Sequence, residues 1–375
     1  MSFELTPKEQ SRIDAAASLE MKVDPISHVD MSTIIVVSLV YAVQSAGFCF
    51  QFWNRHYPPL KAKNIPLMLS LSFGQVMWFL GDIFTGGLVH LDGSPFLRNC
   101  KLTLIWFRAC LGAYMVTSLF ALRCYSLYCV FHKGKPYKGK VVYTSFGIAI
   151  GSLAFFGMVS TLVPGHLTTH YEVIVDMCFT SRGYITVVLI VIWSIWVYTA
   201  VMYWKLRNIS FCFNERAEIV AYFVLLLVVN ILNTVCLLVI RVYPAHSAWR
   251  NSLVYINHVC ASVGYWAIMW EPTYQCAFHR AEYLQHWIKT LAEGDMEKQY
   301  SYITNPPDEA TQNLMQSVDG MAAVHSGPYP PRNDPYKAHA DDTKGDEINY
   351  SLEATPDFSL ATKIEYGRCF HGSRL

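Results

Sequence analysis

The amino-acid sequence predicts an all-α membrane protein built around a seven-transmembrane helix bundle. Of its 375 residues, 53% are hydrophobic and 15% are charged, and a typical soluble domain has about 25% charged residues. Seven apolar runs each reach the roughly 20 residues that cross the hydrocarbon core of a bilayer. None of them alternates polar and apolar residues as a membrane β-strand does. Helices are therefore expected, because they satisfy their own backbone hydrogen bonds in lipid.

The chain divides by composition into four parts. Residues 1–30 form a short polar tail, expected outside the cell, without the basic start and apolar core of a cleavable signal peptide. Residues 31–270 carry the seven expected helices, and residues 271–292 form an amphipathic helix at the inner interface. Residues 293–375 are rich in proline and acidic side chains, which predicts a disordered cytoplasmic tail. The seven expected helices cover residues 31–53, 65–89, 101–131, 141–163, 183–204, 217–242 and 251–270.

Basic residues in the short loops predict how the helices are oriented. The loops after the first, third and fifth expected helices hold ten lysines and arginines, whereas the loops on the other side hold three. Cytoplasmic loops of membrane proteins carry the excess of basic residues. We therefore expect the N-terminus outside and the C-terminus inside.

The third expected helix carries charged residues that a membrane-spanning helix rarely holds without partners. Arg108 lies in its outer part, and Asp82 of the second helix lies at a similar depth, about 10 Å from the outer end at 1.5 Å per residue. We expect the two to pair, either as the floor of a ligand pocket or as a structural ion pair. Cys100, at the outer start of the same helix, and Cys178, in the loop between the fourth and fifth helices, both face the oxidising side. A disulfide between them is predicted.

A second pair of charges is expected at the inner end. Arg123 lies near the end of the third helix, and Glu215 lies where the sixth helix begins. An ion pair between them would latch the two helices together, and its opening would free the sixth helix to move. The alternative is that Glu215 pairs locally with Arg216.

Several short motifs resemble those of G-protein-coupled receptors. Phe213-Asn214-Glu215 is similar to the motif that opens helix six in glutamate-type, or class C, receptors, where its acidic residue pairs with a basic residue of helix three. The runs at residues 55–61, 119–128 and 270–272 resemble fungal seven-helix proteins of the regulator-of-G-protein-signalling type. The resemblance covers about residues 31–290. The large outer ligand-binding domain of class C and the regulator domain of the fungal proteins are both missing from the sequence.

The resemblance implies a receptor in the cell membrane that passes an extracellular small-molecule or nutrient signal to a heterotrimeric G protein. Membrane lipid would surround it, and a dimer is compatible with this architecture. We expect no enzymatic activity, no cofactor or bound metal and, at a net charge of +1, no nucleic-acid partner. The candidate pocket residues are Asp82, Arg108, Tyr184, Trp193, Tyr265 and Trp266, and the candidate G-protein contacts are Lys133, Lys135, Lys205 and Arg207.

Two candidate modifications and two other functional classes complete the expectations. Cys276, on the interfacial helix, is a candidate for palmitoylation, and Thr355, which precedes a proline, is a candidate for phosphorylation. An integral-membrane zinc hydrolase could use Asp82, His90 and His258 with water as the fourth ligand, although no HExxH motif is present. A transporter would favour repeats or broken helices, and the sequence shows neither.

Overall fold

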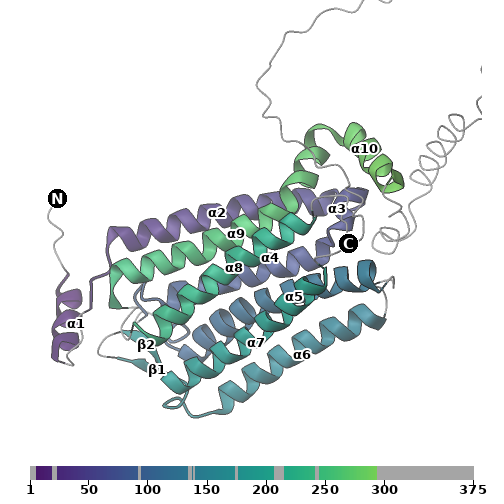
Figure 1. The fold of residues 1–375 in the computed structure, drawn as a ribbon. Coiled ribbons are helices and arrows are strands. Elements are labelled where there is room, and N and C mark those ends of the chain that lie inside the picture. Colours follow the sequence, from purple (N-terminus) through teal and green to yellow (C-terminus); the bar gives the residue numbers. More distant parts are fainter. Residues whose placement is uncertain are drawn as a thin grey trace, which may run out of the picture. The chain divides into compact units, whose positions relative to one another are not determined.

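A computed structural model describes residues 6–18, 23–91, 94–133, 137, 140–173, 176–206, 215–240 and 245–293 of the chain. The described part is mostly helical, with one short β-hairpin (Figure 1). The predicted tail beyond Glu293, which includes Thr355, lies outside the described residues. The elements in chain order are α1 (Pro7–Ser18), α2 (His28–Trp53), α3 (Pro58–Ala62), α4 (Ile65–Thr85), η1 (Lys101–Tyr114), α5 (Met115–Leu127), η2 (Tyr128–His132), α6 (Lys140–Leu162), β1 (Thr169–Glu172), β2 (Met177–Thr180), α7 (Arg182–Leu206), α8 (Glu215–Leu238), α9 (Ser247–Phe278) and α10 (Arg280–Glu293).

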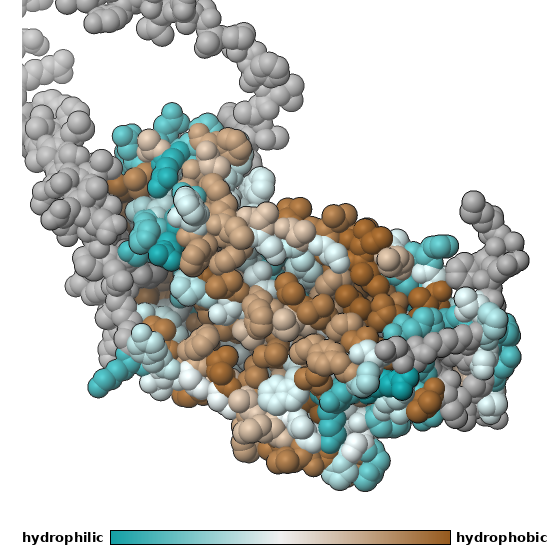
Figure 2. Space-filling view, turned by 180° about the vertical axis from the view of Figure 1, so that it is seen from behind, coloured by the Kyte–Doolittle hydropathy of each residue, from teal (hydrophilic) through white to brown (hydrophobic). Residues whose placement is uncertain are grey.

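Six helices of the described part are long and apolar enough to cross a membrane. They are α2, α4, the continuous helix η1–α5–η2, α6, α7 and α8. Large apolar side chains such as Ile190 and Val197 of α7 and Ile148 and Phe155 of α6 are exposed on these helices. Figure 2 shows apolar side chains, in brown, over much of one face. These features establish a multi-pass helical membrane protein.

The last long helix, α9, differs from the sequence prediction in its extent. The expected seventh helix and the first residues of the expected interfacial helix form one helix of 32 residues, with Pro272 inside it. Pro272 has no backbone N–H to donate, so the carbonyl oxygen of Ile268 lacks its usual helical donor. The neighbouring Thr273 hydroxyl donates to the Met269 carbonyl oxygen. The amphipathic helix α10 begins only after His279.

The helix η1–α5–η2 lies at the centre of the packing. Its most apolar window is 67% buried, the highest value among the six candidate spans. Its first 14 residues, η1, form a π-helix, a wide helix usually confined to single turns and often found at functional sites. Glycines allow η1 and α4 to approach closely. A Cβ atom on Gly81 would lie 2.6 Å from the backbone of Arg108, and one on Gly112 would lie 2.8 Å from the Cα atom of Trp78.

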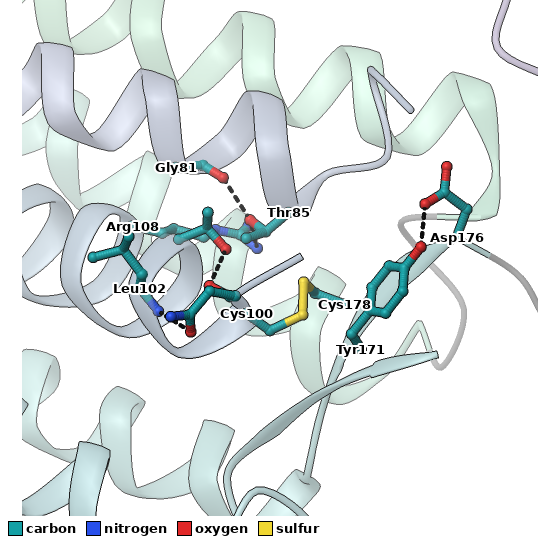
Figure 3. The surroundings of a disulfide bond; sticks show 10 residues. Gly81, Thr85, Cys100, Leu102, Arg108, Tyr171, Asp176 and Cys178 are labelled. Atoms are coloured by element: carbon teal, nitrogen blue, oxygen red, sulfur yellow. Dashed lines mark hydrogen bonds between the residues drawn. A yellow bond between two sulfur atoms is a disulfide. The ribbon is translucent and has the colours of Figure 1, made fainter. Parts of the chain in front are cut away.

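The β-hairpin covers one end of the helices, here named the hairpin end. Strands β1 and β2 pair antiparallel, with Tyr171 opposite Cys178. A disulfide joins Cys178 to Cys100 at the start of η1 (Figure 3), which confirms the predicted bond. The turn is fixed by Asp176, whose carboxylate accepts from the Tyr171 hydroxyl at 2.6 Å and from the backbone N–H of Leu91 at 3.0 Å. The hairpin is therefore fastened both to η1 and to the segment that follows α4.

The start of α9 holds the segment before α2 in place at the same end. Arg250 and Asp30 are both 0% exposed, and two guanidinium nitrogens of Arg250 each lie 2.7 Å from a carboxylate oxygen of Asp30. Arg250 also donates to the carbonyl oxygens of Asp24 and Pro25. This bidentate, fully buried pair binds the N-terminal segment to α9, although the sequence suggests only an ordinary loop charge at Arg250.

Candidate functional site: a partly open cavity and two charge clusters

The structure brings Asp82 of α4 and Arg108 of η1 into contact. The Nε atom of Arg108 lies 2.6 Å from Oδ1 of Asp82, and the two side chains are 13% and 1% exposed. Arg108 also donates to the Thr85 hydroxyl at 3.4 Å, and that hydroxyl in turn donates to the Gly81 carbonyl oxygen (Figure 3). The close approach of η1 at Gly81 thus positions the arginine against the carboxylate.

Asp82 is also the centre of a larger set of polar contacts, the Asp82 network, formed by Tyr41, Asp82, Arg108, Asn257 and His258. Oδ2 of Asp82 lies 3.2 Å from Nε2 of His258 and 3.4 Å from the amide nitrogen of Asn257. Nδ1 of His258 lies 2.9 Å from the Tyr41 hydroxyl. The network links α2, α4, η1 and α9, and it satisfies polar groups that would be costly to bury alone.

Beside Arg108 lies a partly open cavity of about 100 Å³, lined mainly by η1, α5, α7 and α8. Thr180, at the end of the disulfide-linked strand β2, contributes to its lining. Two further lining residues are Trp196, which is 4% exposed, and Asn230, which is 7% exposed. Trp196 Nε1 and Asn230 Nδ2 have no hydrogen-bond partner among the described residues. A buried donor without a partner costs about 1–3 kcal/mol, so the cavity favours an occupant that carries acceptor atoms.

Of the predicted pocket residues, Arg108 and Tyr184 line this cavity. Asp82 does not line it but forms the ion pair with Arg108. Trp193 instead donates to the Thr234 hydroxyl at 3.1 Å and links α7 to α8. Tyr265 is 0% exposed, and its hydroxyl donates to Oε1 of Gln51 at 2.7 Å.

Trp266 packs on α2, where a Cβ atom on Gly47 would lie 2.3 Å from its ring. The residues Trp193, Tyr265 and Trp266 therefore do not line the cavity, and they act in packing between helices. Trp196 and Asn230 were not predicted from the sequence. The available signal was an indole and an amide within otherwise apolar helices.

A second cluster of charges lies at the opposite end of the helices, here named the α3 end, and consists of Lys63, Arg123 and Glu218. Nζ of Lys63 lies 2.8 Å from both carboxylate oxygens of Glu218. A terminal guanidinium nitrogen of Arg123 lies 3.9 Å from the same carboxylate, and Arg123 donates to the Lys63 carbonyl oxygen at 3.0 Å. All three side chains are at most 7% exposed. The cluster joins the segment between α3 and α4 to α5 and α8.

The predicted latch between Arg123 and Glu215 cannot be located in the same way. Residues 207–214, with Arg207, and the side chains of Glu215 and Arg216 lie outside the described part of the chain. The described carboxylate beside Arg123 is Glu218, which lies one helical turn after Glu215 on α8. Lys63 lies in the sequence between the first two expected helices, and its burial depends on the fold of α3 and α4.

Between the Asp82 network and this cluster lies a third set of buried polar side chains. Gln75 of α4 accepts from Nε2 of Gln44 at 2.8 Å and donates to the Ala261 carbonyl oxygen at 3.0 Å. Its amide also donates to the Tyr222 hydroxyl at 3.4 Å. Tyr222 lies one turn after Glu218 on α8, and its ring packs where Gly264 of α9 has no side chain. Polar contacts therefore occur at several levels along the helices.

The other predicted functional residues lie away from the cavity. Lys133 and Lys205 both place their ammonium groups over the ring of Tyr128, at 5.2 and 5.5 Å, and Lys135 lies outside the described residues. Cys276 is 5% exposed, so its acylation would require a local opening of α9.

The residues considered for zinc do not come together as a group of three. His90 lies 3.3 Å from Asp176 and 3.9 Å from Glu9, whereas His258 contacts Asp82. Within the described ranges, no group of three His, Cys, Asp or Glu residues is placed to hold a metal ion.

The fold and these sites define the class of the molecule as a multi-pass helical membrane protein. No protein-family model matches the chain, and no curated protein is significantly similar to it. Its function is therefore argued from the described contacts.

Proposed function

We propose that this protein is a seven-helix receptor that transmits an extracellular small-molecule signal to a heterotrimeric G protein. In this proposal α9 is the seventh crossing, the hairpin end faces outward and the α3 end faces the cytoplasm. The excess of basic residues in the loops near the α3 end supports this orientation. The disulfide at the hairpin end supports it as well, because disulfides persist on the oxidising side.

The observation that carries the proposal is the buried cluster of Lys63, Arg123 and Glu218. It holds α5 and α8 together at the proposed cytoplasmic end through one carboxylate shared by two cations. Breaking a buried charge cluster by removing one partner is strongly destabilising. In this proposal the cluster closes one arrangement of the helices, and in a second arrangement the end of α8 is released.

The ligand would occupy the cavity lined by Trp196 and Asn230. Their unpartnered N–H groups favour a small molecule with carbonyl, carboxylate or hydroxyl oxygens, held within apolar walls. Such a ligand can activate the receptor only if it binds the released arrangement more tightly. Gln75 and Tyr222 lie between the cavity and the cluster and are the proposed route of coupling, with Lys133, Lys135, Lys205 and Arg207 at the G-protein face.

The test measures nucleotide exchange on Gα subunits in membranes that contain the protein. Glu218→Gln removes the charge that Lys63 and Arg123 share, so basal exchange is expected to rise. A loss of only about 1.4 kcal/mol from the closed arrangement would increase the released population about tenfold. Glu282→Gln is the matched control, because this carboxylate at the α3 end is 85% exposed, and its exchange is expected to equal wild type.

The same assay separates the two candidate carboxylates. If Glu218 is the latch, Glu215→Gln leaves basal exchange close to wild type. A rise in basal exchange with Glu215→Gln but not with Glu218→Gln favours the pair Arg123 and Glu215 instead. Amounts of folded protein are matched by thermal unfolding in detergent. The proposal fails if exchange with Glu218→Gln is unchanged or lower on every Gα subunit while the variant is folded.

A further inference from the structure

A basic groove at the α3 end is not used by the proposed receptor mechanism. It has a volume of about 740 Å³ and is bordered by the end of α2, α3, the start of α4, α5 and α6. The residues that carry its charge are Arg55, Lys61 and Arg123, and His56 also lines it. Its size lies within the roughly 300–1,000 Å³ of small-molecule sites. No carboxylate is among the described residues that line it.

Arg123 gives this groove a buried donor without a partner. Its side chain is 5% exposed, and its Nε atom has no hydrogen-bond partner among the described residues. The terminal nitrogens of the same guanidinium are engaged with the Lys63 carbonyl and Glu218. A donor buried in this way favours an acceptor in the groove, and the surrounding positive charge favours an anionic one.

Two more cations line the groove, and one of them lies over an aromatic ring. The Arg55 guanidinium lies 4.9 Å from the centroid of the Phe52 ring, and its Nε atom donates to Nε2 of His56 at 3.4 Å. Lys61 lines the same groove from α3. The Tyr137 hydroxyl, which also lines the groove, is hydrogen-bonded to the Ser145 hydroxyl at 2.6 Å.

The rim of the groove is apolar and open to the surroundings of the helices. Phe52 is 48% exposed, Leu69 is 41% exposed and Tyr143 is 79% exposed, and all three line the groove. Leu69 lies on α4 and Tyr143 on α6, two of the candidate membrane-spanning helices. Acyl chains can therefore lie against the rim while a headgroup enters the basic part. A soluble anion would use only the basic part.

We propose that this groove binds an anionic phospholipid. Its headgroup phosphates are held by Arg55, Lys61 and the Nε atom of Arg123, and its acyl chains lie on the apolar rim. Basic pockets between membrane helices on the cytoplasmic side are suited to polyanionic headgroups. A phosphate that accepts from Arg123 also competes with Glu218 for this guanidinium, so the lipid contacts the charge cluster directly. The inference rests on the orientation proposed above, with the α3 end facing the cytoplasm, and does not depend on G-protein coupling.

The test measures binding of a fluorescent short-chain phosphatidylinositol phosphate to the full-length protein in phosphatidylcholine nanodiscs. The double variant Arg55→Gln/Lys61→Gln is expected to bind up to about 30-fold more weakly, because it removes two direct contacts to the headgroup phosphates, each worth up to about fivefold. The matched control is Lys133→Gln/Lys205→Gln, which removes the same charge at the same end from residues placed over Tyr128. This control is expected to stay within about twofold of wild type, since its charges act only from outside the groove.

A second variant tests the apolar rim. Leu69→Ser is expected to weaken binding of the lipid and to leave binding of soluble inositol phosphate unchanged. Equal losses of lipid affinity in the two double variants would mean that the lipid is attracted by the overall surface charge and not by the groove, and would overturn the proposal. Inositol phosphate that binds as tightly as the lipid would assign the groove to a free phosphate ligand. Equal binding of phosphatidylcholine and the anionic lipid would also overturn it. None of these readouts involves exchange on Gα, so this inference and the receptor proposal can fail separately.

Discussion

The close approach of α4 and η1 at Gly81 leads to the most quantitative prediction. A Cβ atom at this position lies 2.6 Å from the N, Cα and Cβ atoms of Arg108, whereas non-bonded carbon atoms prefer about 3.5–4.0 Å. Gly81→Ala therefore forces the two helices apart by about 1 Å, because the obstructing atoms belong mainly to the backbone and cannot rotate away. The shift also moves Arg108 away from Asp82.

The control for this substitution is Gly151→Ala on α6, where an added Cβ atom meets nothing within 4 Å. Both variants gain the same helix propensity, about 1 kcal/mol, so the difference between them isolates the clash. Overpacking costs about 1–3 kcal/mol. At about 2–4 °C per kcal/mol, the two variants should differ by about 2–12 °C in melting temperature.

The assay is thermal unfolding of each purified protein in the same detergent, followed by intrinsic fluorescence. Gly81→Ala is expected to melt below wild type, and Gly151→Ala at or slightly above it. If Gly81→Ala melts together with Gly151→Ala, then α4 and η1 are not packed backbone to backbone at this level. The described position of Arg108 beside Asp82 would then be wrong as well.

Three further substitutions test the other buried contacts. Asp82→Asn leaves Arg108 buried without its carboxylate partner, and removing one partner of a buried pair costs about 3–5 kcal/mol. The melting temperature should therefore fall well below that of wild type, and an unchanged melting temperature would exclude the buried pair. Cys178→Ser opens a disulfide that spans 78 residues and should cost about 4 kcal/mol; reductant should lower the melting temperature of wild type but not of this variant. Arg250→Gln removes the bidentate contact to Asp30, so hydrogen exchange in residues 23–30 should accelerate, and unchanged protection there would contradict the described contact.

The sequence was sufficient to predict features that depend on hydropathy and helix geometry. Long apolar runs indicated a multi-pass membrane protein, and the positions of Cys100 and Cys178 indicated the disulfide. Counting residues from the helix ends placed Asp82 and Arg108 at one depth, where the structure has them in contact. A buried charge in a membrane helix needs a partner, and few candidates share a given depth.

The sequence could not predict contacts that depend on how helices rotate and pack. Lys63 follows the short helix α3, and only the fold turns it inward to meet Glu218. The π-helical winding of η1 changes which residues face the cavity, and no local residue pattern predicts this winding. Aromatic residues of α9 such as Tyr265 were chosen by type alone. Their pairing with α2 depends on the rotation of α9 about its own axis.

The account depends most on whether Glu218 holds the α3 ends of α5 and α8 together. This is tested by measuring the distance between spin labels at His132, at the end of η2, and Ala217, beside Glu218. Both residues are exposed, and incorporation of labelled noncanonical amino acids leaves the native thiols unmodified. Wild type should give one short distance, and Glu218→Gln should add a second, longer distance. Identical distance distributions for the two proteins would contradict the account.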